Sequence, residues 1–173
     1  MNALPSLSTR ARRAVTPLTA TLAMAALLSL PGEARAEDGD RQIVKLRIEI
    51  YTGGDDLRTA SNAIATLKYT SVSGNQMTAS INMNNGVAWP GWSLRTVNFT
   101  LPTGVLLSRA YAFRIQFYSG QPDIFSTGDN WNMNGITVTG ILGDESEVVL
   151  VQQRGSPLHR LQSDNWTLWE TAI

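Results

Sequence analysis

Strict alternation of apolar and polar residues is the feature of this sequence that most limits its fold. In Val44–Ile50 every second residue is apolar, and the residues between them are charged. The same two-residue period runs through Met77–Asn84 and Tyr111–Tyr118. Successive side chains of a strand point to opposite faces, so the pattern predicts antiparallel sheets with one buried and one wetted face. The side chains expected on the buried faces are Val44, Leu46, Ile48, Ile50, Met77, Ala79, Ile81, Met83, Tyr111, Phe113, Ile115 and Phe117.

Weaker strand patterns fill most of the remaining sequence, and no stretch after residue 36 shows a sustained helical period. Turn-forming residues such as Gly53-Gly54, Pro90-Gly91 and Ser73-Gly74-Asn75 separate these segments. Seven to nine short strands with such turns predict an all-β fold, an antiparallel β-sandwich of two packed sheets. The weaker strands are expected at Asn62–Tyr69, Leu94–Leu101, Gly135–Ile141, Glu147–Gln152, Leu158–Leu161 and Trp166–Glu170.

The first 36 residues have the parts of an export signal. Arg10, Arg12 and Arg13 form a positive head, and a mostly apolar run follows from Leu18 to Leu30. Ala34-Arg35-Ala36 then places small residues at the two positions that a signal peptidase reads. The apolar run is shorter than the roughly 20 residues of a membrane-spanning helix. An uncleaved amphipathic anchor is the alternative interpretation.

We therefore expect two parts in the chain, a cleavable signal peptide over residues 1–36 and one β-sandwich binding domain over residues 37–173. The mature protein is expected to be exported, to the periplasm or the cell exterior, without a transmembrane segment. Cleavage removes four of the 14 basic residues and one of the 14 acidic ones, which leaves a net charge of −3 by formal counting. With no basic surplus, nucleic acid is an unsuitable partner.

The residue inventory argues against catalysis. The sequence contains no cysteine, and therefore no thiol nucleophile, thiolate metal site or disulfide. A serine triad would need His159 as its base, because the sequence has no other histidine. His159 lies between two leucines in an expected late strand, where a packing or surface role is more typical. Asp55 and Asp56 are adjacent, so they do not by themselves flank a glycosidic bond. We therefore expect a protein that is not an enzyme.

Two polar loops carry the oxygens that calcium prefers. Asp55 and Asp56 follow the Gly53-Gly54 pair, and Asp129 and Asn130 lie in the loop Gly128–Asn132. Calcium takes six to eight oxygens from carboxylates, amides and backbone carbonyls. If both loops lie at one end of the sandwich, a calcium ion bound by Asp55, Asp56, Asp129 and Asn130 would bridge them. The alternative is that these residues only form turns, since Asp and Asn hydrogen-bond their own backbone.

Tryptophans form the second group of candidate ligand-binding residues. Trp89 and Trp92 flank a Pro-Gly turn that would hold both rings on one protrusion, where indoles stack on sugars or lie at a lipid interface. Burial of these rings in the core is the alternative. For Trp131 we expect burial, at the end of the sandwich core.

Three segments together resemble a group of exported bacterial domains. They are Thr52–Arg58 (TGGDDLR), Gly128–Met133 (GDNWNM) and Leu158–Leu161 (LHRL) ahead of Trp166. The order of these elements is similar to that of the PLAT/LH2 family of β-sandwiches, which accompany lipases and lipoxygenases. The resemblance implies a domain that docks onto a lipid or a protein partner, in some members with calcium at loop sites. The matching loops then assign calcium to Asp55, Asp56, Asp129 and Asn130. No catalytic domain accompanies this sequence, which favours a free-standing binding protein.

The sequence thus predicts a secreted, non-catalytic binding module with calcium as its one candidate cofactor. The partner is expected to be a lipid, glycan or protein surface. A carbohydrate-binding domain using Trp89 and Trp92, and a small carboxylate-based hydrolase, are the alternatives.

Overall fold

The computed structural model describes residues 41–121, 125, 127–163 and 167–173, all within one compact unit, Ala34–Ile173. The predicted signal peptide, residues 1–36, lies outside the described residues, as does Trp166. In the described ranges no helix is long and apolar enough to cross a membrane.

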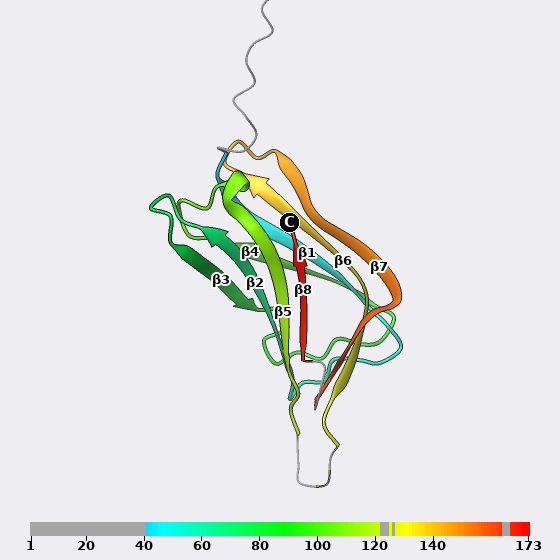
Figure 1. Cartoon of the computed structure of the whole chain (residues 1–173). Coiled ribbons are helices and arrows are strands. Elements are labelled where there is room, and N and C mark those ends of the chain that lie inside the picture. The colour runs from blue at the N-terminus through cyan, green and yellow to red at the C-terminus, as the bar shows by residue number, and fades with distance from the viewer. Residues whose placement is uncertain (1–40, 122–124, 126, 164–166) are drawn as a thin grey trace, which may run out of the picture. The chain divides into compact units, whose positions relative to one another are not determined.

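The described part of the chain forms two packed four-stranded sheets (Figure 1). One sheet has the strand order β4-β1-β6-β7 and the other β3-β2-β5-β8, and all neighbouring strands are antiparallel. This arrangement confirms the predicted all-β antiparallel sandwich. The elements are β1 (Ile43–Thr52), β2 (Asn62–Thr70), β3 (Gln76–Asn82), β4 (Leu94–Thr100), the 3-10 helix η2 (Leu107–Arg109), β5 (Ala110–Tyr118), β6 (Asn130–Leu142), β7 (Glu147–Gln162) and β8 (Leu168–Ala172).

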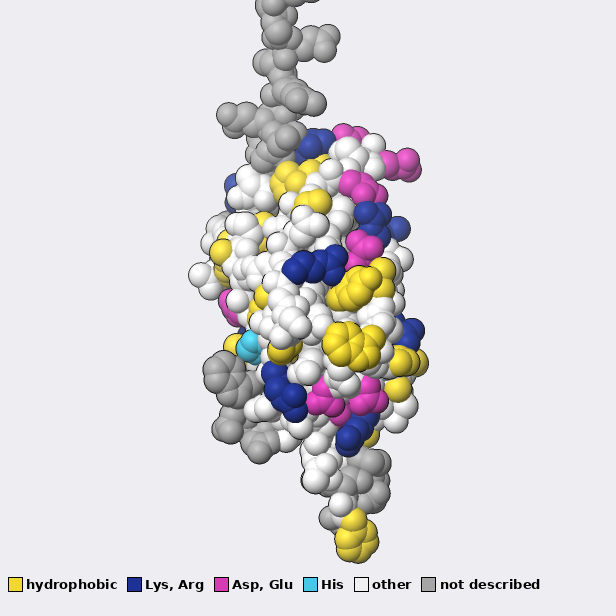
Figure 2. Space-filling model, turned by 90° about the vertical axis from the view of Figure 1, so that its right-hand side faces the viewer, with side chains coloured by type: hydrophobic (Ala, Val, Ile, Leu, Met, Phe, Trp, Pro, Cys, Tyr) yellow, Lys and Arg dark blue, Asp and Glu magenta, His cyan; other side chains and the backbone are white. Residues whose placement is uncertain are grey.

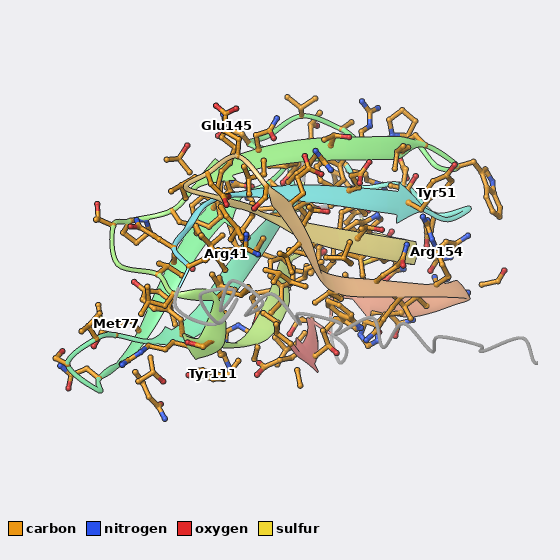
Figure 3. All side chains as sticks on the ribbon, turned by 90° about the horizontal axis from the view of Figure 1, so that it is seen from above. Arg41, Tyr51, Met77, Tyr111, Glu145 and Arg154 are labelled. Atoms are coloured by element: carbon orange, nitrogen blue, oxygen red, sulfur yellow. The ribbon has the colours of Figure 1, made fainter. Side chains whose placement is uncertain are left out.

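Most of the side chains predicted to face inward form the core between the sheets, with exceptions where strands begin. In β1, Ile43 is buried in place of Val44, because a bulge shifts the register between Ile43 and Lys45. Met77 and Tyr111 were predicted to be buried, but 44% and 38% of their surfaces are exposed. Both lie near the start of their strands, at the end of the sandwich opposite Tyr51 (Figure 3). Tyr111 lies at a bulge, since Tyr69 of β2 pairs with Ala110 and Lys68 pairs with Ala112, so its two buried neighbours take the inward positions. The two-residue period alone did not predict this shift.

Two predicted strand boundaries were wrong. Glu147–Gln152 and Leu158–Leu161 belong to one long strand, β7, whose partner on β6 changes from Gly135, opposite Arg154, to Met133, opposite His159. The residues between Arg154 and His159 therefore form a bulge, and the strand continues on both sides of it. In addition, β6 begins at Asn130, inside the segment that was predicted to be a loop.

Four strand connections lie at one end of the sandwich, the lower end in Figure 1. They are β1–β2, β3–β4, β5–β6 and β7–β8, and they contain the segments Thr52–Arg58 and Gly128–Met133. We call this end the motif end. Three aromatic rings close the core there: Trp131 lies edge-on to Trp89, with ring centroids 5.8 Å apart, and contacts Phe117 at 6.4 Å. The predicted burial of Trp131 is confirmed, since its surface is 0% exposed.

Replacement of Trp131 by alanine tests this arrangement of the core. Because the indole is fully buried between Trp89 and Phe117, we expect Trp131→Ala to lower the free energy of unfolding by about 3–5 kcal/mol. Trp92→Ala is the matched control, since 73% of Trp92 is exposed, and it should change stability by about 0.5 kcal/mol or less. Denaturant unfolding measures both. Equal losses in the two variants would contradict the described packing.

Candidate functional site

The carboxylate of Asp129 joins the two sequence motifs at the motif end. Asp129 is fully buried, and its Oδ2 accepts a hydrogen bond of 2.9 Å from the backbone N–H of Arg58. Its Oδ1 lies 3.4 Å from Nε of the same arginine. The backbone N–H of Asp129 also donates to Oγ of Ser119, at 2.6 Å. This aspartate therefore fixes the β1–β2 connection against the start of β6, and its carboxylate is engaged by Arg58.

The glycine pair of the first motif allows close approach between loops. The Gly53 N–H donates to the Asn132 carbonyl over 2.6 Å, and a Cβ on Gly53 would lie 2.5 Å from Oδ1 of Asn134. A Cβ on Gly54 would lie 3.1 Å from the ring of Trp92, so this indole rests on the glycine backbone. A side chain at position 53 would therefore collide with Asn132 and Asn134, whereas one at position 54 would press on the exposed indole of Trp92.

Thr52 attaches the third loop. This buried threonine accepts a hydrogen bond of 2.8 Å from the Ser93 N–H, and its hydroxyl lies 2.8 Å from the carbonyl of Pro90. The Trp92 N–H in turn donates to the Gly53 carbonyl. The β3–β4 connection, which carries Trp92, is therefore held by the first residues of the TGGDDLR segment.

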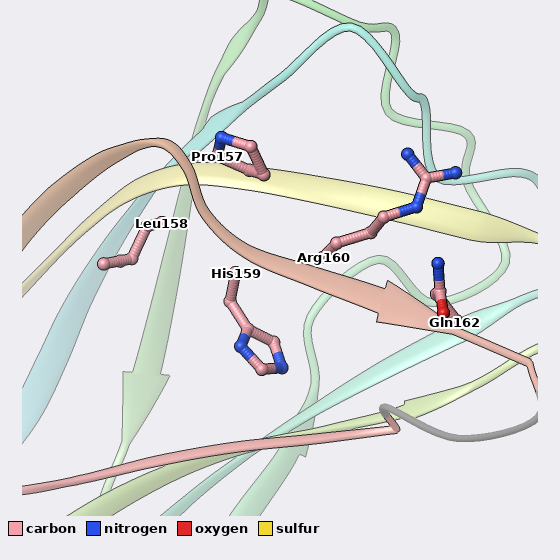
Figure 4. Close-up of a pocket in the computed structure, with 5 residues that line it drawn as sticks. All are labelled: Pro157, Leu158, His159, Arg160 and Gln162. Carbon is pink, nitrogen blue, oxygen red and sulfur yellow. The ribbon is translucent and has the colours of Figure 1, made fainter.

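A second arginine engages the other acidic loop. Nη2 of Arg160, on β7, lies 3.1 Å from Oδ2 of Asp55, and Nη1 lies 3.4 Å from Oδ1 of Asn132. The Asp55 carbonyl also accepts a hydrogen bond of 3.3 Å from the Asn132 N–H. Arg160 thus links β7, the β1–β2 connection and β6. Figure 4 shows its guanidinium on the opposite side of β7 from the ring of His159.

The predicted calcium ligands meet at one end, but their oxygens do not form a cage. Asp55 faces Arg160, and Asp129 is buried against Arg58, while Asp56 and Asn130 are half-buried. In the part of the chain that the structure describes, no three acidic, histidine or cysteine side chains gather as metal ligands would. Calcium needs six to eight oxygens, and here guanidinium groups already balance two of the carboxylates. The residues as placed do not fit a bound calcium ion.

The two candidate indoles separate, which corrects the prediction of a paired platform. Trp89 is only 4% exposed, because its backbone N–H and carbonyl pair with buried Leu57 and its ring turns toward Trp131. Trp92 is 73% exposed and has a backbone φ of 56°, in the left-handed region that large side chains rarely adopt. The loop therefore holds Trp92 outward in a strained conformation without burying its ring.

An aromatic and cationic contact between Tyr51 and Arg154 was not predicted. Figure 3 shows Tyr51 and Arg154 close together at the edge of the sandwich. The guanidinium carbon of Arg154 lies 4.8 Å from the centre of the Tyr51 ring. The arginine reaches it across Gly135, where a Cβ would lie 2.6 Å from Cδ of Arg154. No local pattern indicated this contact, because its three residues come from three different strands.

His159 lines a shallow pocket of about 320 Å³ with Pro157, Leu158, Arg160 and Gln162 (Figure 4). Partial burial lowers the pKa of its imidazole below the ordinary value of 6.5, and a hydrogen bond with the backbone of Leu168 acts in the opposite direction. The ring therefore spans from β7 toward the start of β8. This placement is that of a packing residue between the edges of the two sheets.

Comparisons with known proteins show a similarity of fold only. No family model and no curated protein matches this chain. Among solved structures, the alpha-toxin of Clostridium perfringens avian strain SWCP superposes with a TM-score of 0.53 and 14% identity, over 79% of this chain and 33% of the toxin. The alpha toxin of Clostridium absonum superposes with a TM-score of 0.50 and 15% identity, over 82% and 34%. This chain therefore spans about a third of each toxin and shares a β-sandwich architecture with that part.

Removal of the Asp129 carboxylate tests whether it holds the motif end. Asp129→Ala removes a fully buried carboxylate and leaves the part-buried backbone N–H of Arg58 without its acceptor, so we expect the free energy of unfolding to fall by about 1–3 kcal/mol. Asp144→Ala is the control, because that carboxylate is 57% exposed and pairs with Arg41 at the surface, so its loss should lower the free energy of unfolding much less. Denaturant midpoints report both values. A loss for Asp129→Ala no larger than for Asp144→Ala would refute the assigned role.

Proposed function

We propose that this protein is an exported, non-catalytic binding domain that docks onto a lipid surface through its motif end, with Trp92 as the principal contact. One observation carries the proposal. Trp92 is exposed and strained, whereas Trp89, Trp131 and Trp169 are each at most 8% exposed. The positive φ of Trp92 costs energy, and the isolated domain does not bury the ring in return. Such strain is typical of residues that contact a partner.

Other apolar side chains at the same end favour a lipid surface. Four of the five exposed aromatic residues in the described part of the chain lie on strand ends or connections of the motif end, and the fifth, Tyr111, lies at the opposite end. Indole and phenol rings prefer the interface between water and hydrocarbon. Several rings on one end would enter that interface together. The residues are Tyr51, Trp92, Tyr118 and Phe125.

The charges at the motif end favour zwitterionic lipid. The Arg160–Asp55 and Arg58–Asp129 pairs cancel in sign, and Figure 2 shows positive and negative side chains side by side toward the lower end. The domain from residue 37 onward has a formal net charge of −3. Electrostatic attraction to anionic lipid is therefore weak, and binding depends on the aromatic side chains.

The PLAT/LH2 resemblance supports the same proposal, since it implies docking to a lipid or protein partner, and the two-sheet sandwich agrees with that family's fold. The absence of catalysis is also part of the proposal. Asp55 faces Arg160, and Asp129 is buried against Arg58. Neither carboxylate is therefore free to flank a substrate bond, as a pair of catalytic carboxylates must. Calcium is not required, because guanidinium groups hold the loops.

Co-sedimentation with phosphatidylcholine vesicles tests this function. We expect the wild-type domain to bind, and Trp92→Ala to weaken binding about tenfold or more, since burial of a large apolar side chain contributes roughly 1.5–3 kcal/mol. Tyr111→Ala is the aromatic control at the opposite end and should bind like the wild type. Raising the salt concentration should change little.

Two results would refute the proposal. One is a wild-type domain that stays in the supernatant with every phosphatidylcholine vesicle preparation. The other is Trp92→Ala binding as tightly as Tyr111→Ala. Binding that appears only with anionic vesicles and disappears in salt would instead indicate an electrostatic contact and contradict the aromatic mechanism.

A further inference from the structure

A row of four residues crosses the outer face of the β4-β1-β6-β7 sheet near the motif end. Tyr51 of β1 is the ladder partner of Leu94 of β4 on one side and of Gly135 of β6 on the other. Gly135 in turn pairs with Arg154 of β7. Cross-strand partners point to the same face of a sheet, and Leu94, Tyr51 and Arg154 are all exposed there. We call these four residues the Tyr51 row.

Gly135 lets the arginine of this row reach the tyrosine. The Arg154 side chain runs over the Gly135 backbone, where a Cβ would lie 2.6 Å from Cδ and 2.8 Å from Nη1 of the arginine. The guanidinium carbon lies 4.8 Å from the centre of the Tyr51 ring, and Figure 3 shows the two side chains together. Any side chain at position 135 would occupy this path. The glycine and the ring therefore hold the guanidinium on an exposed face of the sheet.

The contact with Tyr51 does not neutralise the charge of Arg154. The face of an aromatic ring attracts a cation through its quadrupole, but it carries no opposite charge and no oxygen acceptor for the N–H donors. In the described ranges no carboxylate forms an ion pair with Arg154, whereas five other cations each pair with one. Arg154 thus keeps its positive charge and its fork of N–H donors for a partner. The five paired cations are Arg41, Arg47, Arg58, Lys68 and Arg160.

A phosphate group matches these donors. A guanidinium is planar, always charged and able to donate two parallel hydrogen bonds, an arrangement that suits phosphate oxygens. Apolar groups adjoin the cation in the same row, since Leu94 is 50% exposed and Tyr51 is 42% exposed. Aromatic side chains at a membrane lie at the level of the head groups, which is where a phospholipid carries its phosphate. A cation beside exposed apolar groups therefore favours the phosphate of a lipid.

The Tyr51 row also adjoins the residue proposed to enter the lipid. Trp92 lies two positions before Leu94 in the chain, and its backbone N–H donates a hydrogen bond of 2.8 Å to the Gly53 carbonyl, two positions after Tyr51. The pairing between these two segments thus continues from the row to Trp92. A domain that inserts Trp92 into a lipid surface would therefore bring the row to the level of the head groups.

We propose that Arg154, held over the ring of Tyr51, binds the phosphate of a phospholipid head group when the domain docks. The proposal rests on the lipid docking through Trp92 and deepens it by naming the head-group chemistry. Trp92 supplies an apolar contact that does not distinguish head groups, whereas Arg154 requires a phosphate. A zwitterionic phospholipid suits both residues, because its phosphate is a local negative charge on a lipid without net charge.

Binding to vesicles with and without phosphate tests this assignment. Phosphatidylcholine vesicles are compared with vesicles of digalactosyl diacylglycerol, which is also uncharged but contains no phosphate. We expect Arg154→Gln to weaken phosphatidylcholine binding about fivefold, because hydrogen bonds between charged groups are among the stronger ones. The same variant should bind digalactosyl diacylglycerol like the wild type. Lys45→Gln is the matched control, since it removes one positive charge from the same face of the sheet at the opposite end of β1, and it should bind both vesicles like the wild type.

The two proposals fail in different ways. The phosphate assignment is wrong if folded Arg154→Gln, as judged by its melting temperature, binds phosphatidylcholine like Lys45→Gln, or if it weakens binding to both vesicles equally. Docking through Trp92 is wrong if Trp92→Ala binds both vesicles like the wild type, and a loss in Arg154→Gln that is confined to phosphatidylcholine then still supports the phosphate contact. A wild-type domain that binds neither vesicle overturns both proposals. Tight binding of inorganic phosphate in the absence of vesicles would contradict a lipid head group as the ligand.

Discussion

The buried carboxylate of Asp129 is the contact on which the rest of the motif end depends. It accepts the backbone N–H of Arg58 and lies against that arginine's Nε, and so joins two segments that are 71 positions apart. A buried carboxylate is costly unless it is paired and hydrogen-bonded, and Arg58 supplies a hydrogen bond to Oδ2 and a charge 3.4 Å from Oδ1. The same two segments are joined by a second contact nearby, the hydrogen bond from the Gly53 N–H to the Asn132 carbonyl. Arg160 of β7 also binds the carboxylate of Asp55 there.

The scaffold presents two groups to a partner. The β3–β4 connection, held by Thr52 and Gly53, presents Trp92 outward, and the pairing of β1, β6 and β7 presents Arg154 over the ring of Tyr51. The Arg58–Asp129 and Arg160–Asp55 pairs each cancel in sign, and the described part of this end also carries exposed aromatic rings.

Sequence patterns predicted the sheets well because burial imposes its period directly on the residues, as in Leu46, Ile48 and Ile50. They predicted the site less well, because its contacts join strands far apart in the sequence. The two-residue period of a strand does not indicate that Asp129 contacts Arg58 or that Asp55 contacts Arg160. Likewise, Trp89 and Trp92 flank one turn, and only the pairing of Leu57 with Trp89 and the positive φ of Trp92 send one ring inward and the other outward.

Thermal melts of residues 37–173 in calcium and in chelator test most directly whether the chain's own arginines hold the motif end. A calcium ion bound only by the folded state would add about 2.7 kcal/mol at roughly 100 times its Kd, a rise of several degrees in a domain of this size. Because Arg58 and Arg160 already engage the carboxylates of Asp129 and Asp55, our expectation is the same melting temperature in both solutions. A clear rise in calcium would contradict it and make Asp55, Asp56, Asp129 and Asn130 a metal site.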